Sequence, residues 1–240
     1  MSSSSLTLAS VADIHAPRFL NAFRSALSKI ELDSCVAFII AGDIVERGKA
    51  REARAVFELI KEKFKGPIIA VFGNEDYEEI EDRLKMDNPD IIWLNDEFYD
   101  LQVGNITLRI IGSRGVLDNP TPWQRRNIPN IREIYLQRLV KLKTLLRNSP
   151  HPTILVTHYS PTYKTLKGEP PRIWPYMGSR RLEKVVEQYK PLIVIHGHAH
   201  KSHVERAFID VVPVYNVSLP AFNKIFLISF KPRKSLLEYF

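Results

Sequence analysis

The 240-residue chain is 45% hydrophobic and 25% charged, which is ordinary for a soluble globular protein of one large domain or two small ones. Its net charge of +7 is spread along the sequence with no block of five like charges, so it only hints at anionic partners. The single cysteine excludes a disulfide framework, and no transmembrane-length apolar run or signal peptide occurs, which predicts a cytoplasmic protein with no membrane partner.

Apolar runs alternate with helical patterns in the first third of the chain. Strands are predicted over 6–13, 35–43 and 67–74, with helices over 18–30 and 49–64 between them. Such βαβ units form parallel sheets whose central strands are apolar on both faces.

The later elements begin with a hairpin, because alternating runs over 98–113 surround the turn signal Gly104-Asn105. Helices are then expected at 131–148 and near 179–189, and strands at 153–160, 192–200, 202–209, 212–218 and 223–230. Strands in both halves with helices between them predict an α/β fold of two facing mixed β-sheets flanked by helices. We expect this αββα sandwich to form a single domain over 1–240.

Two long loops, 114–130 and 161–178, hold seven of the sixteen prolines and two of the three tryptophans. Long loops in a compact domain are usually functional, and this composition favours ordered ones. Arg114, Arg125 and Arg126 in the first loop are candidates for binding a substrate, because arginine binds phosphate through two parallel hydrogen bonds. The alternative is that they are solvated loop charges.

Five of the predicted strands end in residues that bind metals. These are Asp13 and His15, Asp43, Asn74, His158, and His198 and His200. Residues two apart on an extended backbone point the same way, as expected for the first and last pairs. A single histidine beside a strand is more often structural, but five such strand ends together predict a metal site.

All seven residues offer nitrogen or oxygen donors. Imidazole with carboxylate suits manganese, iron, zinc or cobalt better than magnesium, and we favour manganese. Seven donors exceed the needs of one ion. They fit two divalent metal ions about 3.5–4 Å apart that clamp a phosphoryl group.

The ordered motifs Asp13-x-His15, Gly42-Asp43, Gly73-Asn74, His158 and Gly197-His198-x-His200 resemble those of the calcineurin-like metallophosphoesterase superfamily. The fold of that family, a two-sheet sandwich flanked by helices, agrees with the predicted elements. The resemblance implies a phosphate-ester substrate and a metal-bridging hydroxide as the nucleophile. It also implies one metal held by Asp13, His15, Asp43 and His200, with Asp43 bridging to a second completed by Asn74, His158 and His198.

The third motif departs from the family pattern, which is Gly-Asn-His followed by an acidic residue. Glu75 stands where the resemblance expects a histidine that faces the substrate, and Asp76 matches the acidic end. Both are candidate catalytic residues: Glu75 as the acid, if its surroundings raise its pKa, and Asp76 as the group that orients a ligand. An anion at position 75 should repel a dianionic monoester more than a monoanionic diester, which predicts a phosphodiesterase.

Three alternatives remain open. A phosphomonoesterase would use the same metal site. A nuclease would explain the basic loops, although the chain has no obvious room for an extra DNA-contacting domain, so a nucleic-acid partner is not favoured. A non-catalytic scaffold derived from the fold is opposed by the complete set of ligand positions. No sequence feature specifies the oligomeric state.

Overall fold

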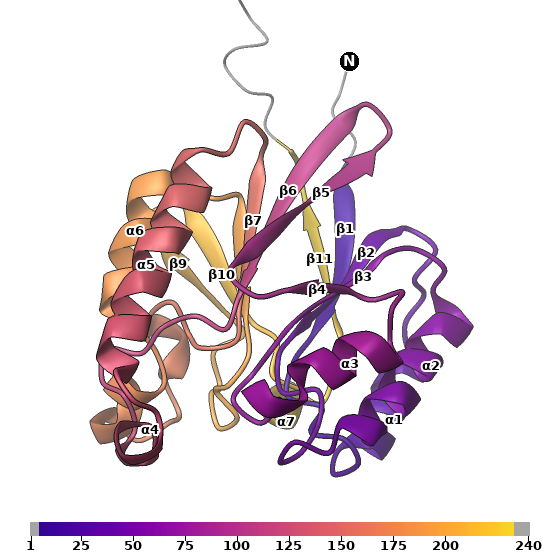
Figure 1. Ribbon diagram of the computed structural model, residues 1–240. Coiled ribbons are helices and arrows are strands. Elements are labelled where there is room, and N and C mark those ends of the chain that lie inside the picture. Colours follow the sequence, from indigo (N-terminus) through magenta and orange to yellow (C-terminus); the bar gives the residue numbers. More distant parts are fainter. Residues whose placement is uncertain (1–4, 233–240) are drawn as a thin grey trace, which may run out of the picture.

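The computed structural model describes residues 5–232, which form two facing β-sheets between two layers of helices (Figure 1). This arrangement confirms the predicted αββα sandwich. The first sheet has the order β11 (Phe226–Phe230), β1 (Leu6–Val11), β2 (Cys35–Ala41), β3 (Ile68–Val71), β4 (Ile92–Leu94). The second has the order β5 (Glu97–Val103), β6 (Ile106–Ser113), β7 (Thr153–Thr157), β8 (Ile193–His196), β10 (Val212–Asn216), β9 (Arg206–Ile209).

The helices lie on the two outer faces and at the ends of the strands. They are α1 (Leu20–Ser28), α2 (Ala53–Lys63), α3 (Glu81–Asp87), α4 (Pro122–Asn127), α5 (Ile131–Arg147), α6 (Arg180–Tyr189) and α7 (Leu219–Phe222). Figure 1 shows α1, α2 and α3 on the side of the first sheet, and α5 and α6 on the side of the second. None of the helices within 5–232 is both long enough and apolar enough to cross a membrane.

Both sheets are mixed, and their parallel strands decide where a site can form. In the first sheet β1 to β4 are parallel, and β11 pairs antiparallel with β1. In the second, β6, β7, β8 and β10 are parallel, with β5 and β9 antiparallel at the edges. The carboxyl ends of parallel strands share one edge, so the loops that follow them gather there.

The core has three apolar layers, and single strands contribute to two of them. On β2, Ile39 packs between the sheets, while its neighbour Ile40 packs under the helices with Phe23 of α1 and Phe57 of α2. The third layer lies between the second sheet and α5 and α6. This explains why the central strands are uninterrupted apolar runs, since both faces are buried.

Several boundaries differ from the sequence prediction. The helix expected over 49–64 begins as a 3-10 turn, Ala50–Glu52, before α2, and the strand expected over 202–209 begins only at Arg206. The sequence missed α3, β4, α4 and α7, which have three to seven residues and are too short for a periodic signal. The predicted hairpin is confirmed, with Val103 paired to Ile106 across the turn.

Gly112 on β6 lies where the second sheet passes close to β3 and β4 of the first. A Cβ atom there would meet Val71 Cγ1 at 2.8 Å and would also collide with the Leu94 side chain. We expect Gly112→Ala to lower the free energy of unfolding by about 1–3 kcal/mol, because the extra carbon overpacks the layer between the sheets. Urea denaturation measures this change. Ordinary Gly→Ala replacements at compatible sites stabilise, so a gain in stability would contradict the close approach.

Candidate metal centre

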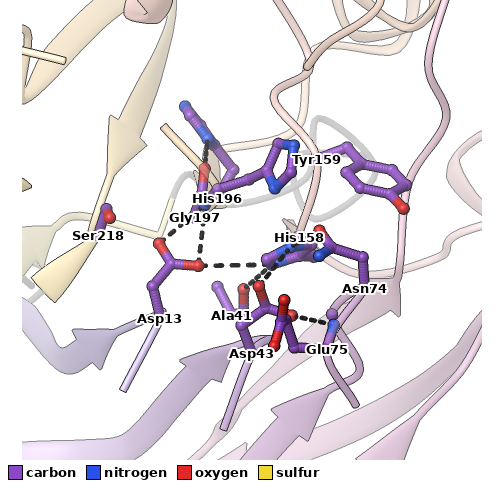
Figure 2. A network of polar contacts seen from close by, with 12 residues as sticks. Asp13, Ala41, Asp43, Asn74, Glu75, His158, Tyr159, His196, Gly197 and Ser218 are labelled. Carbon is purple, nitrogen blue, oxygen red and sulfur yellow. Dashed lines mark hydrogen bonds and ion pairs between the residues drawn. The ribbon is translucent and has the colours of Figure 1, made fainter. Parts of the chain in front are cut away.

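The seven ligand-type side chains meet in one place, where loops from both sheets converge. They follow the carboxyl ends of β1, β2, β3, β7 and β8. Within each of two groups, every residue offers one donor atom within 4.8 Å of the others: Asp13, His15, Asp43 and His200, and then Asp43, His158 and His198. Asp43 belongs to both groups. Figure 2 shows its carboxylate beside His158 and Asn74.

The two oxygens of the Asp43 carboxylate differ in their hydrogen bonding. Its Oδ1 accepts a hydrogen bond of 2.7 Å from the Glu75 N–H. Its Oδ2 is buried and has no hydrogen-bond partner among the described residues; it lies 3.4 Å from His158 Nε2 and 3.6 Å from His15 Nε2. An unpartnered buried carboxylate oxygen is costly unless a cation meets it. Asp43 Oδ2 therefore lies where an ion shared between the two groups would bind.

Asp13, which follows β1, is hydrogen-bonded to the loop after β8. Both of its oxygens accept the His198 N–H, at 3.1 and 2.9 Å, and its Oδ1 lies 3.5 Å from His200 Nε2. Burial alone would raise the pKa of Asp13, but His200 and His158 nearby hold it well below the usual range. Asp13 is thus ionised at neutral pH and ready to bind a cation.

His158 is held in the form that coordinates metals. Its Nδ1 lies 3.1 Å from the Ala41 carbonyl, which can only accept, so Nδ1 carries the proton and Nε2 keeps its lone pair. That Nε2 lies 3.0 Å from Asn74 Oδ1, so two acceptor atoms converge on the same space. Burial lowers the pKa of His158 to about 3, and the pKa of His198 well below its usual value, so both imidazoles are neutral at pH 7.

Four of the ligand residues have a left-handed backbone, which β strands do not allow. Their φ angles are 61° for Asp13, 42° for His15, 51° for Asp43 and 69° for His198. β1 already ends at Val11, so Asp13 and His15 do not lie on the extended backbone that the sequence analysis assumed. Each such conformation costs about 1–3 kcal/mol, and residues of this kind cluster at functional sites.

Gly42 and Gly73 leave space that the ligands His158 and Asp43 occupy. A Cβ atom on Gly73 would collide with the backbone nitrogen and Oδ1 of Asp43. One on Gly42, whose φ is 86°, would lie 2.6 Å from His158 Nδ1. Any larger residue at either position would displace a ligand, which explains why the strands end in glycine.

The comparisons with known proteins agree with this geometry. The family model for calcineurin-like phosphoesterases matches residues 6–202. The chain belongs to this family. No curated protein sequence matches the phosphoesterase.

Solved structures share the fold of the phosphoesterase at low sequence identity. A phosphopantetheinyl hydrolase from Mycobacterium tuberculosis matches with a TM-score of 0.71 and 16% identity over 97% of this chain and 99% of the other. GAP50, described as the anchor in the inner membrane complex of Plasmodium, matches with 0.60 and 16% over 97% and 77%. A dimetal phosphatase from Danio rerio matches with 0.56 and 13% over 88% and 86%.

Asp76 stabilises the loops after β2 and β3 of the phosphoesterase by hydrogen bonds to their backbone. It is fully buried and accepts backbone N–H groups of Ile44 at 3.2 Å, Val45 at 3.0 Å and Gly73 at 2.9 Å. Arg114, which is only 8% exposed, donates to the Asp76 carbonyl at 3.0 Å and to Glu81 Oε1 at 2.8 Å. Asp76 and Arg114 therefore position the loops that carry Asp43 and Asn74, and neither presents its charge at an open surface.

Glu75 occupies a position between the metal centre and the turn at 46–48. Its N–H donates to Asp43, its Oε2 accepts the Arg47 N–H at 2.7 Å, and its carbonyl accepts the Gly48 N–H at 2.9 Å. Arg47 and Gly48 are both left-handed, with φ of 49° and 69°. Glu75 thus joins this turn to the metal centre by hydrogen bonds. The sequence did not predict this structural role.

The exposed Arg125 and Arg126 lie on α4, and among the described residues they make no hydrogen bond or ion pair to the metal centre. The connection from α4 is made by their neighbour Gln124, whose Nε2 donates to the Tyr159 hydroxyl at 3.2 Å. The Tyr159 ring meets the His198 ring edge-on, with centroids 5.0 Å apart. Sequence reasoning missed both residues, although Tyr159 directly follows the ligand His158.

Metal ions should stabilise the phosphoesterase through Asp43. We expect Mn²⁺ at 100 times its Kd to add about 2.7 kcal/mol, seen as a higher Tm, and Asp43→Asn to lose most of this gain. Without metal, Asp43→Asn should be at least as stable as the wild type, because burial and the neighbouring Asp76 and Asp13 raise the pKa of Asp43 well above its usual value.

Differential scanning fluorimetry with chelator and with MnCl₂, together with metal content by mass spectrometry, measures both effects. Asp100→Asn is the matched control, because Asp100 pairs with Arg109 on the distant β5–β6 hairpin and should leave the metal-dependent shift intact. An equal shift in Asp43→Asn and the wild type would contradict the role of Asp43.

Proposed function

We propose that the protein is a dinuclear metal-dependent phosphodiesterase. The position of Asp43 carries the proposal, because it belongs to both ligand groups and its buried Oδ2 has no hydrogen-bond partner in the part of the chain that the structure describes. A carboxylate shared by two groups of imidazole nitrogens and carboxylate oxygens fits a pair of divalent cations.

The donors divide between two ions. One would be held by Asp13, His15, Asp43 and His200, and the other by Asp43, Asn74, His158 and His198. When bound, such a pair supplies Lewis acidity toward the phosphoryl oxygens and an activated water. We favour manganese, since the donors are nitrogen and oxygen only, and we expect the enzyme to act in the cytoplasm.

The protein's own residues prepare this site in three ways. The Ala41 carbonyl fixes the tautomer of His158, the Asp13 carboxylate holds the His198 turn, and Asp76 holds the loops at 43–45 and 73–76. All three act before a substrate arrives. Such preorganisation is what lets fixed charges stabilise a developing charge without further rearrangement.

The preference for a diester rests on Glu75. Its half-buried carboxylate lies close enough to contribute to the pKa shifts of both His15 and Asp43. An anion at this distance repels a dianionic monoester more than a monoanionic diester. Because its Oε2 accepts a backbone N–H, we propose that Glu75 acts as a charged positioning residue rather than as the acid. Without an acid there, substrates with good leaving groups should react best.

The other functions are possible outcomes of the same assay. GAP50 indicates that the fold also occurs in a protein described as an anchor, but the complete set of ligands in this chain favours an enzyme over a scaffold. A phosphomonoesterase or a nuclease would differ in substrate and keep the same metal centre.

Hydrolysis of bis(p-nitrophenyl) phosphate and p-nitrophenyl phosphate, compared with Mn²⁺ and with chelator, tests the proposal. We expect a higher kcat/KM for the diester and loss of activity with chelator. Glu75→His should shift the ratio toward the monoester by roughly 10-fold or more, because one unit charge acting over about 8 Å at an effective dielectric constant of 20 is worth about 2 kcal/mol.

Glu78→His, the same replacement at an exposed position three residues further on, is the control and should leave the ratio unchanged. A monoester preference in the wild type, or an unmoved ratio in Glu75→His, would overturn the charge argument. Loss of bound metal in Glu75→His would instead make Glu75 a ligand. A wild-type protein that binds no metal would indicate a scaffold.

A further inference from the structure

A pocket of about 330 Å³ lies between segment 48–52 and the two residues Ile80 and Arg83. One wall is the 3-10 turn before α2, and the other is the start of α3. These walls follow β2 and β3, the strands that deliver Asp43 and Asn74. The pocket thus belongs to the same edge of the first sheet as the metal ligands.

Two consecutive hydrogen bonds join the pocket to the metal centre. The Gly48 N–H in its wall donates to the Glu75 carbonyl at 2.9 Å, and the Glu75 N–H donates to Asp43 Oδ1 at 2.7 Å. Gly48 follows Asp43 by five residues, which span at most about 18 Å when fully extended. A single small organic molecule can therefore reach from the metal centre into the pocket.

The pocket is lined by apolar and charged side chains. Ala50 and Ile80 supply apolar surface, and Lys49, Arg51 and Arg83 supply three positive charges against the carboxylate of Glu52. Lys49 pairs with Glu46 at 2.8 Å and Arg83 with Asp87 at 3.3 Å, but half-exposed pairs of this kind are worth only about 0–1 kcal/mol. Within residues 5–232, no ion pair engages Arg51.

Positive charge continues from the pocket toward the metal centre. The hydrogen bond from Lys49 lowers the pKa of Glu46, and Arg47 and Arg18 lower it further, so all three cations surround this carboxylate. The Arg18 guanidinium lies over the Phe19 ring, 5.0 Å from its centroid, and that ring meets the His15 ring edge-on with centroids 6.1 Å apart. These cations offset the carboxylates of Glu46 and Glu75, which lie between the pocket and the metal centre.

We propose that this pocket binds a second anionic group of the substrate, a phosphate carried by the organic part beyond the scissile diester. The proposal rests on the proposed phosphodiesterase function and narrows its substrate to a small molecule with two phosphate groups. The pocket volume lies in the range of small-molecule sites, which favours a nucleotide-sized compound over a nucleic-acid strand.

Two chromogenic diesters that differ only in the second phosphate test this. They are thymidine 5′-(p-nitrophenyl phosphate) and the same compound with a 3′-phosphate. We expect the 3′-phosphate to lower KM by roughly 5- to 10-fold in the wild type, and the double variant Arg51→Gln/Arg83→Gln to lose this advantage while its kinetics on the plain diester stay within about twofold. Arg132→Gln/Arg147→Gln, which removes two exposed charges from α5, should keep the advantage.

A binding experiment separates this proposal from the reaction. Calorimetric titration of the chelator-treated protein compares adenosine 3′,5′-bisphosphate with adenosine 5′-monophosphate. Tighter binding of the bisphosphate, by roughly fivefold and lost only in Arg51→Gln/Arg83→Gln, supports the pocket even if no diester is hydrolysed, a result in which the proposed function alone would fall. Equal affinities in the wild type, a preference that survives in that variant, or tighter binding of a short oligonucleotide would each overturn it.

Discussion

The buried Asp43 carboxylate is the constraint on which the site depends. It lies in the protein interior beside two other buried acids, Asp13 and Asp76, whose charges oppose its own. Burying like charges together is unfavourable unless hydrogen bonds or cations compensate. Asp43 Oδ1 accepts the Glu75 N–H, and within residues 5–232 Asp43 Oδ2 has no hydrogen-bond partner. A cation at the point where the two groups of ligands overlap would compensate this charge.

The charges of the two neighbouring carboxylates are compensated by hydrogen bonds from backbone N–H groups. Asp76 takes three N–H groups from the loops after β2 and β3, and Asp13 takes the N–H of His198 from the second sheet. Charge-assisted hydrogen bonds of this kind are about twice as strong as neutral ones. They offset the strain of the left-handed ligand residues and join loops from both sheets. The ligand positions are therefore part of the packing of the domain and do not depend on long flexible loops.

The sequence predicts the layers and the ligand set because both follow from strong local patterns. Central strands such as β2 are apolar on both faces, and a donor residue follows each of them closely in the sequence, so the apolar run and the ligand are recognised together. The left-handed turn at Asp13 was missed because the loop conformation depends on hydrogen bonds to residues far along the chain, such as His198. The sequence makes Arg114 a candidate for binding a substrate, since nothing in its sequence neighbourhood reveals that it donates to Glu81 and to the Asp76 carbonyl. Contacts with residues far along the chain determine both the backbone conformation at Asp13 and the burial of Arg114. A single sequence does not show which distant residues make these contacts.

The glutamate at position 75 connects the centre to its surroundings in a way that a histidine would change. Its carboxylate adds negative charge beside the ligands and also holds the turn at 46–48, beyond which the cations around the pocket begin. Repulsion near the metals and attraction further out act on different parts of one substrate. The combination favours a molecule with a single negative charge at the reacting phosphorus and additional charge some distance away. In the proposed reaction a diester that carries a second phosphate meets both conditions, whereas a simple monoester places its charge where the site least tolerates it.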